Sequence, residues 1–266
     1  MIAVITILAA VIFPVISKVR ENARKSSCMS NMEQLGLAFS QYSQDNNGIN
    51  PNGVNWYLPG GNGWAGQVNP YVKSNTVYLC PDDSHGAHCS YAYNSNNTLP
   101  TGHSVSSYGI AKYRNPSKTI LLFEVAGNRL ALPDAWDFKS DSATYGSGGY
   151  SPAGWGVSDG TNFPYAVTGA GAFFTVSLQL ATGYFRNTPA KDYPRYLAAT
   201  GRHSDGANYL MADDHAKWLN GNSITAGTTS PSPTQCNIGG IKDKHRVLVA
   251  AGPECSDSTI VATFSL

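Results

Sequence analysis

The stretch MIAVITILAAVIFPVIS, from Met1 to Ser17, decides how this chain is organised. Thr6 is the only polar residue before Pro14, and seventeen residues is close to the shortest length that crosses a bilayer. The run has no charged segment before it and no small-residue cleavage site after it, so it differs from an ordinary secretory signal. A buried core helix is the alternative. Because the run stands at the terminus and leads directly into charged residues, we expect an apolar helical stalk.

The predicted helix continues beyond the apolar run with one apolar face. The segment DNNG at residues 45–48, followed by Pro51, is expected to end it. To about Tyr42 the helix would be roughly 60 Å long at 1.5 Å per residue. Pro14 lacks a backbone N–H and is expected to kink or loosen it. The face is formed by apolar residues at mostly three- and four-residue spacing: Val15, Val19, Ala23, Met29, Met32, Leu35, Ala38 and Phe39.

Residues 46–266 have the composition of a water-exposed head, so we expect a stalk over residues 1–45 and one globular head after it. The chain of 266 residues carries a net charge of +1, and only 13% of its residues are charged. It is long enough to bury a core unaided. No basic patch follows residue 25, which argues against a nucleic-acid partner.

The junction of stalk and head is basic, because Lys18, Arg20, Arg24 and Lys25 face a single acid, Glu21. Positive charges beside a membrane segment stay in the cytoplasm. That rule conflicts with disulfides in the head, which form after export. A mature N-terminus upstream of Met1, preceded by a basic leader, would resolve the conflict, and we expect one.

The five cysteines favour disulfides over a metal or redox motif, since none lies in a CxxC pair. In an exported chain the default is structural disulfides with one thiol left over. Cys236 and Cys255 are expected to pair and would contribute roughly 3 kcal/mol in the chain-entropy model. Cys28 and Cys89 both compete for Cys80.

The head is predicted to be β-rich, and the fold class α+β: a long N-terminal hydrophobic helix packed on an antiparallel β-sheet head with long loops. A hairpin is expected with Asp213 and Asp214 at its turn. Because a type I′ turn favours Asp-Gly, Asp214 predicts strain or a different turn type. Residues 141–175 and 221–235, rich in Gly, Ser or Thr, are expected surface loops. The predicted strands are Thr76–Cys80, Ser90–Tyr93, Thr119–Val125 and Ala207–Ala212.

The hairpin region has the residue types of a metal site. His203, Asp213 and His215 could hold a divalent ion, with Ca²⁺ as plausible as Zn²⁺. We favour a structural role instead. In that interpretation His203 hydrogen-bonds across the turn, and the side chains of Asp213 and Asp214 cap local backbone amides.

The sequence has no HExxH or P-loop motif, so we expect neither an enzyme nor a cofactor. His85 and His88 precede Cys89 and could bind copper or zinc, but an exposed loop is the preferred interpretation. Glu124 ends an apolar segment and is expected at the rim of the sheet or paired with a cation such as Arg202.

Several segments resemble a known family. Residues 7–51, which begin ILAAVIFPVIS, resemble the N-terminal methylated helix of type IV pilins and type II secretion pseudopilins. His203 and Asp213, separated by nine residues, resemble the His-x9-Asp-Gly signature of a large bacterial subfamily. KTILLFEVA at residues 118–126 and VYLCPDD at residues 77–83 resemble its central strand and its Cys-Pro segment.

Two departures from the subfamily are visible. Asp214 stands where the subfamily has Gly. Alignment on ILAA implies that about eight mature residues and a leader precede Met1. In the family those residues include a Glu that is thought to pair with the N-terminal ammonium of the preceding subunit.

The resemblance implies a structural subunit of an extracellular type IV pilus-like filament, which waits in the inner membrane and then polymerises through its stalk. The implied partners are other copies of the chain, the pilus or type II secretion assembly machinery and the inner membrane. One alternative is a type II secretion pseudopilin. Another is a membrane-anchored carbohydrate-binding module that stacks sugars on Trp56, Tyr57, Trp64, Trp136 and Trp155. The predicted filament-core residues are Ile2, Val4, Ile5, Ile7, Leu8, Val11, Ile12, Phe13 and Pro14.

Overall fold

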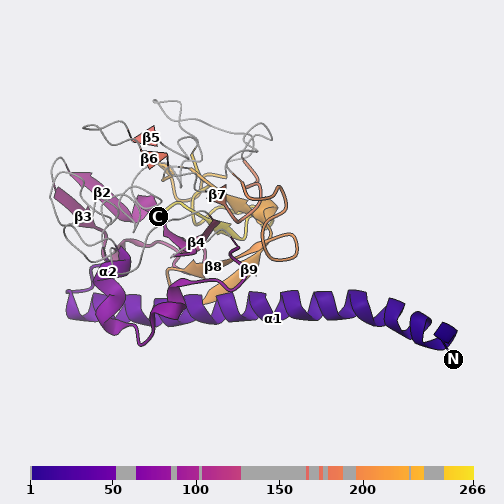
Figure 1. The fold of residues 1–266 in the computed structure, drawn as a ribbon. Helices are drawn as coiled ribbons and strands as arrows, with labels where there is room; N and C mark the ends of the chain where they lie inside the picture. Colours follow the sequence, from indigo (N-terminus) through magenta and orange to yellow (C-terminus); the bar gives the residue numbers. More distant parts are fainter. Residues whose placement is uncertain are drawn as a thin grey trace.

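The computed structural model describes residues 2–51, 64–84, 89–101, 104–126, 166–167, 174–175, 179–187, 196–227, 229–236 and 249–266. A single long helix, α1 (Ile2–Asp45), carries a β-rich head on its C-terminal half. The helix runs along the base of the head and projects beyond it, with the N-terminus at the free end (Figure 1). The α+β architecture predicted from the sequence is confirmed.

The helix α1 divides into two halves that differ in burial. Between Ile2 and Ile16 no side chain is buried, whereas the C-terminal half presents a buried stripe to the head. The helix continues through Pro14 and ends at Asp45, where Asn47 and Gly48 adopt positive φ, as expected from the DNNG segment. The stripe recurs every three or four residues and contains Cys28, Met32, Leu35, Gly36, Ala38, Phe39 and Ser43.

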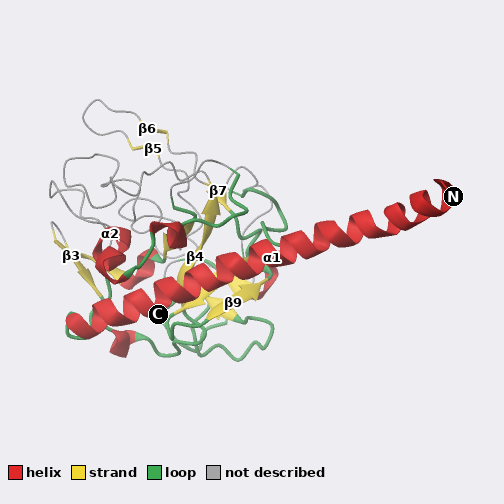
Figure 2. Cartoon of the chain, turned by 60° about the horizontal axis from the view of Figure 1, so that its bottom comes forward, coloured by secondary structure: helices red, strands yellow, loops and turns green. Residues whose placement is uncertain are grey.

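The head is built on an antiparallel sheet in the order β1-β4-β8-β9, and β7 also pairs with β4. The central strand β4 pairs with β1, β8 and β7. Figure 2 shows α1 crossing in front of this sheet. The strands are β1 (Tyr91–Tyr93), β4 (Ile120–Ala126), β7 (Gln179–Leu180), β8 (Ala207–Met211) and β9 (Ala216–Leu219).

The sheet is covered on both faces. Alternate side chains such as Tyr93, Leu122 and Leu210 join the stripe of α1 in one core. Side chains of opposite orientation, such as Phe123 and Tyr209, form a second core with the C-terminal segment. This alternation follows from the period of two along a strand.

Short elements complete the head. Ile224–Thr225 (β10) and Ala262–Thr263 (β11) form a parallel pair, which holds the C-terminal segment in the second core. Two further pairs are antiparallel: β2 (Thr98–Thr101) with β3 (Ser104–Ser107), and β5 (Ala166–Val167) with β6 (Phe174–Thr175). The helical turns are α2 (Trp64–Val68), η1 (Asn69–Tyr71), η2 (Asn75–Tyr78), η3 (Ser95–Asn97), η4 (Ile110–Lys112) and η6 (Gly221–Ser223).

Three of the four predicted strands are confirmed, and one is wrong. The segment Thr76–Cys80 contains the end of a 3-10 helix, because the side chain of Ser74 accepts a hydrogen bond from the backbone N–H of Thr76 and starts a helical turn. The segment 221–235 is not only a surface loop, since it contains the buried strand β10. Within residues 141–175, only 166–167 and 174–175 are described.

The hairpin of β8 and β9 has a turn that suits an aspartate. Asp214 has a φ of 68°, and its N–H donates to the carbonyl oxygen of Met211, while the N–H of Met211 donates to His215. This is a three-residue connection with one left-handed residue, in place of a type I′ turn with two. Aspartate tolerates that conformation better than most residues. The hairpin at Asp213 and Asp214 is confirmed, with a different turn type.

The cysteine pairing is resolved by the structure. Cys236 bonds to Cys255, as expected, and Cys28 rather than Cys89 is the partner of Cys80. Cys89 is a buried free thiol. The Cys28–Cys80 bond links α1 covalently to the head.

Candidate functional site

The exposed half of α1 is the first candidate surface. Among the described residues, α1 is the one helix that is long and apolar enough to cross a membrane, with a mean hydropathy of 2.5 over its best window and none of that window buried. Leu8 is 57% exposed and Phe13 is 70% exposed. A contiguous apolar surface of this kind marks a site for a membrane or for another protein.

The hydroxyl groups in this half of α1 are satisfied by the helix itself. The Thr6 hydroxyl donates to the carbonyl oxygen of Ala3, and the Ser17 hydroxyl donates to that of Phe13. Backbone polar groups within a helix are paired along the segment, which is the condition for entering an apolar environment. The exposed half therefore needs no water around its side chains.

The second candidate is the junction, the region in which residues 21–28 of α1 contact the head. Besides the Cys28–Cys80 disulfide, Arg24 forms an ion pair with Asp82 at 2.8 Å. The side chain of Asn208 donates to the carbonyl oxygen of Lys25, and the Lys25 ammonium lies 5.0 Å from the ring centre of Trp218. The junction thus combines a covalent bond, an ion pair and a cation–π contact within a few turns of α1.

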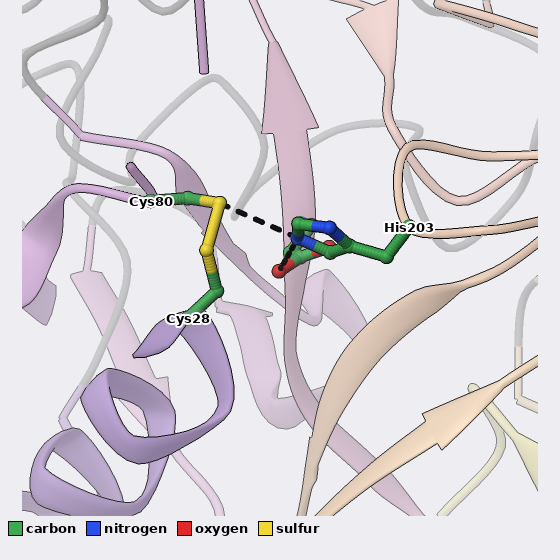
Figure 3. Close-up of side chains that lie close together, drawn as sticks. Cys28, Cys80 and His203 are labelled. Carbon is green, nitrogen blue, oxygen red and sulfur yellow. Dashed lines mark hydrogen bonds and ion pairs between the residues drawn. A yellow bond between two sulfur atoms is a disulfide. The ribbon is translucent and has the colours of Figure 1, made fainter. Parts of the chain in front are cut away.

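His203 lies at the centre of the junction and is fully buried. Its Nδ1 is 2.8 Å from Oε1 of Glu21 on α1 and 3.9 Å from Oδ2 of Asp82. Its Nε2 is 3.3 Å from Oε1 of Glu124 on β4. Figure 3 shows the imidazole facing the Cys28–Cys80 disulfide, and Nε2 is 3.4 Å from Sγ of Cys80. One side chain therefore contacts α1, β4 and the Cys-Pro segment.

Glu124 is a fully buried carboxylate with several partners. It accepts hydrogen bonds from the backbone N–H and the side-chain amide of Asn208, in addition to its contact with His203. The expected rim position is wrong, and the basic side chain that pairs with Glu124 is His203 rather than Arg202. Arg202 instead pairs with Asp83 at 3.3 Å and donates to the carbonyl oxygen of Val125.

The carboxylates around His203 control its charge. Burial disfavours the imidazolium and lowers the pKa of His203, but hydrogen bonds and charge interactions with Glu124 and Glu21 outweigh burial and raise this pKa above its ordinary value. Both carboxylates therefore favour the protonated form of the ring, which lies between Glu21 of α1 and Glu124 of β4. Such a bridge holds α1 against β4.

The signature residues of the hairpin do not converge on one site. His203 contacts α1 and β4, so the predicted hydrogen bond from His203 across the turn is wrong. Asp213 instead forms an ion pair with His215 at the turn, and Asp214 accepts a hydrogen bond from Ser40 of α1. Among the residues described, no cluster of potential metal ligands joins His203 to Asp213 or His215.

Other candidates from the sequence fall inside the core or outside the described residues. Trp64 is buried against Phe39 and Tyr78, so it is not available to stack on a sugar. Burial raises the pKa of the Cys89 thiol to about 12, which leaves it protonated and unreactive. The remaining candidates, at positions 56, 57, 85, 88, 136 and 155, lie outside the described residues.

Glu21 and Asp82 were not among the residues that the sequence patterns indicated as partners of His203. A signal for them exists once the disulfide is known. Glu21 lies seven residues, or about two helical turns, before Cys28 and so shares its face of α1. Asp82 lies two residues after Cys80. The Cys28–Cys80 bond therefore brings both carboxylates to the same side of the junction.

A comparison with models of known protein families shows to which family the chain belongs. A family model described as "Protein of unknown function (DUF1559)" matches residues 17–205, which is most of the chain. The chain belongs to this family. It is a family of prepilin-like and pseudopilin-associated proteins. No curated protein and no solved structure matches the chain. The DUF1559 segment begins where the apolar run ends, and it includes Glu21, Asp82, Glu124 and His203.

Proposed function

We propose that the chain is a structural subunit of a type IV pilus-like extracellular filament. One observation carries the proposal: the two halves of α1 differ completely in burial, with an apolar, uncovered N-terminal half and a C-terminal half packed into the head. A helix with a large exposed apolar surface is stable in two places from which water is excluded, one before assembly and one after it. It can lie in the inner membrane as a monomer and in the dry centre of a bundle after assembly.

The free energy of burial favours the transfer of the stalk from the membrane into a bundle. Each large aliphatic side chain contributes roughly 1.5–3 kcal/mol when it leaves water. Membrane and bundle both remove the apolar half of α1 from water, so transfer between them costs little, and close packing of neighbouring stalks then stabilises the polymer. An ATPase-driven machine in the cytoplasm would extract the subunits, as the resemblance to pilins implies. No chemical reaction is part of this role.

The junction supports the proposal mechanically. The Cys28–Cys80 disulfide and the buried bridge of His203 with Glu21 and Glu124 hold the head at one position along α1. When stalks bundle in a fixed register, the heads then take fixed places on the exterior. A loosely attached head would leave the filament surface irregular.

The test is a comparison of two aspartate substitutions by electron microscopy of material sheared from cells that express the complete gene. Leu8→Asp places a charge in the stalk bundle, where an unpaired charge costs several kcal/mol, and is expected to abolish filaments. Ile110→Asp places the same charge on an exposed apolar residue of the head and is the matched control. Filaments of normal abundance from Leu8→Asp would refute the role of the stalk.

The principal rival is a type II secretion pseudopilin, which the prepilin-like family also accommodates. A pseudopilin uses the same stalk packing but forms a short fibre that remains in the cell envelope. Deletion of the gene separates the two. Loss of long surface filaments with normal protein secretion supports the pilus, and a secretion defect without surface filaments supports the pseudopilin.

A further inference from the structure

We propose that Glu21, Asp82 and His203 bind one divalent transition-metal ion of the Zn²⁺ class at the junction of stalk and head. The site goes beyond the proposed function, because it requires only the folded subunit and no filament. Its three ligands come from α1, from the segment after Cys80 and from the segment before β8. A metal here would connect three parts of the chain that are distant in sequence.

The ligand atoms have the spacing that a small ion needs. Nδ1 of His203, a carboxylate oxygen of Glu21 and one of Asp82 all lie within 4.8 Å of one another. The two distances from Nδ1 are 2.8 Å to Glu21 and 3.9 Å to Asp82. A tetrahedral ion with bonds near 2.0–2.1 Å separates its ligands by about 3.3 Å, so shifts of less than about 1 Å per atom suffice.

A second, independent observation is the orientation of the imidazole by Glu124. Nε2 of His203 faces the buried Glu124 carboxylate at 3.3 Å, and this carboxylate is held in turn by two hydrogen bonds from Asn208. Metal-binding histidines almost always donate their other ring N–H to such a carboxylate, which fixes the tautomer and raises ligand basicity. Nδ1 is then left as the metal-facing nitrogen, on the side of Glu21 and Asp82.

The charge balance of the junction also favours a divalent cation. Three carboxylates, Glu21, Asp82 and Glu124, surround His203, and the guanidinium of Arg24 pairs with Asp82. Asp83 is compensated separately by Arg202. With a neutral imidazole the cluster therefore carries two uncompensated negative charges, which one divalent ion neutralises. Binding displaces the Nδ1 proton and competes with Arg24 for Asp82.

The site is accessible from one side. The side chains of Glu21 and Asp82 are 25% and 17% exposed, whereas that of His203 is fully buried. An ion can enter from solvent past the two carboxylates, and water can occupy its fourth position. An imidazole ligand selects Zn²⁺ and related ions over Ca²⁺, which prefers oxygen. Cys28 and Cys80 are joined in a disulfide and so cannot supply thiolates.

The experiment uses the full chain in detergent, treated with a chelator and then dialysed. Isothermal titration with Zn²⁺ is expected to give one tight site per chain. Glu21→Gln and Asp82→Asn are each expected to weaken it by at least about tenfold, the lower end of the loss seen even for an orienting partner. Glu33→Gln, on the exposed side of α1, is the matched control and should bind Zn²⁺ like the parent chain.

A second readout identifies the ligands. Co²⁺ absorption reports coordination by nitrogen and oxygen, and Zn²⁺ should raise the melting temperature of the parent chain but not that of Glu21→Gln. Absence of a tight Zn²⁺ site in the parent chain would overturn the proposal. So would Zn²⁺ affinity that is unchanged in both junction variants. Loss of binding in His215→Asn alone would move the ion to the hairpin turn and also overturn it.

Discussion

The two halves of α1 have the same backbone conformation but opposite relations to solvent. The half around Leu8 is apolar on every side and wholly uncovered, whereas the half around Phe39 is apolar on one stripe and packed against the sheet. A helix that is apolar all round needs an environment without water, while a striped helix needs one partner on one side. The local sequence of α1 therefore predicts an apolar environment around its N-terminal half and contact with the sheet on one side of its C-terminal half.

The boundary between the halves is where polar chemistry concentrates. Glu21, Arg24 and Lys25 all contact the head, through His203, Asp82 and Trp218 respectively. From Ile2 to Arg20 every residue of α1 is exposed except Ala9, which is half-buried. The junction is therefore the place at which α1 changes from a helix packed on the head to an uncovered apolar helix.

The largest expected effect is on the packed half of α1, where a buried side chain is truncated. Phe39 is buried against Trp64 and Tyr93, and Phe39→Ala is expected to lower the free energy of unfolding by about 3–5 kcal/mol. Leu37→Ala, on the exposed side of the same half, is expected to change it by less than about 0.5 kcal/mol. Urea denaturation in detergent, followed by Trp fluorescence, measures both. Equal losses would contradict the one-sided packing of this half.

Removal of the junction disulfide is the next largest effect. The chain-entropy model gives about 4 kcal/mol for replacement of Cys28 and Cys80 by Ser, and about 3 kcal/mol for replacement of Cys236 and Cys255, because the first pair closes the longer loop. The first double variant should also loosen the head on α1, which limited proteolysis would detect. A larger loss from the Cys236 and Cys255 variant would refute this ranking.

The smallest expected effect concerns the contact between the hairpin turn and α1. Burial raises the pKa of Asp214, and the hydrogen bond from Ser40 only partly opposes this. A carboxyl with a raised pKa stabilises the fold while protonated, below its ordinary value near 3.8, and this contribution is lost as the pH rises through the raised value. Asp214→Asn stays neutral and is expected to gain a few tenths of a kcal/mol over the parent chain at neutral pH.

This gain should disappear toward pH 3, where Asp214 is itself protonated. Asp205→Asn is the matched control, because Asp205 also has positive φ but is exposed. Thermal melts across this pH range measure the difference. A gain that is independent of pH, or an equal gain in Asp205→Asn, would show that backbone conformation rather than charge burial is responsible.

Much of the fold could be predicted because it depends on local patterns. The period of Met32, Leu35 and Phe39 identifies the buried stripe, and the DNNG segment marks the end of α1. Strand β4 is apolar apart from Glu124, and such a short apolar run is consistent with a buried strand. Thr76 and Val77 favour a strand by propensity, but the side chain of Ser74 starts a 3-10 turn there, and one local hydrogen bond outweighs a weak preference.

The junction could not be predicted from local patterns because its residues are far apart along the chain. His203 and Glu21 are separated by 182 residues, and nothing in the surroundings of either indicates the other. The spacing of His203 and Asp213 favours a site at the hairpin turn instead. The Cys28–Cys80 disulfide is the observation that connects these segments, and its pairing was one of two that the sequence left open.

Assembly through the apolar half of α1 can be tested directly by a cryo-electron microscopy map of filaments sheared from cells that express the complete gene. We expect a filament in which residues 2–16 of neighbouring copies pack together along the axis, with the heads outside and the Glu21 side of the junction at the boundary. Filaments whose axis is formed by the heads would contradict it. So would a chain that stays monomeric in the membrane of cells that assemble the remaining machinery.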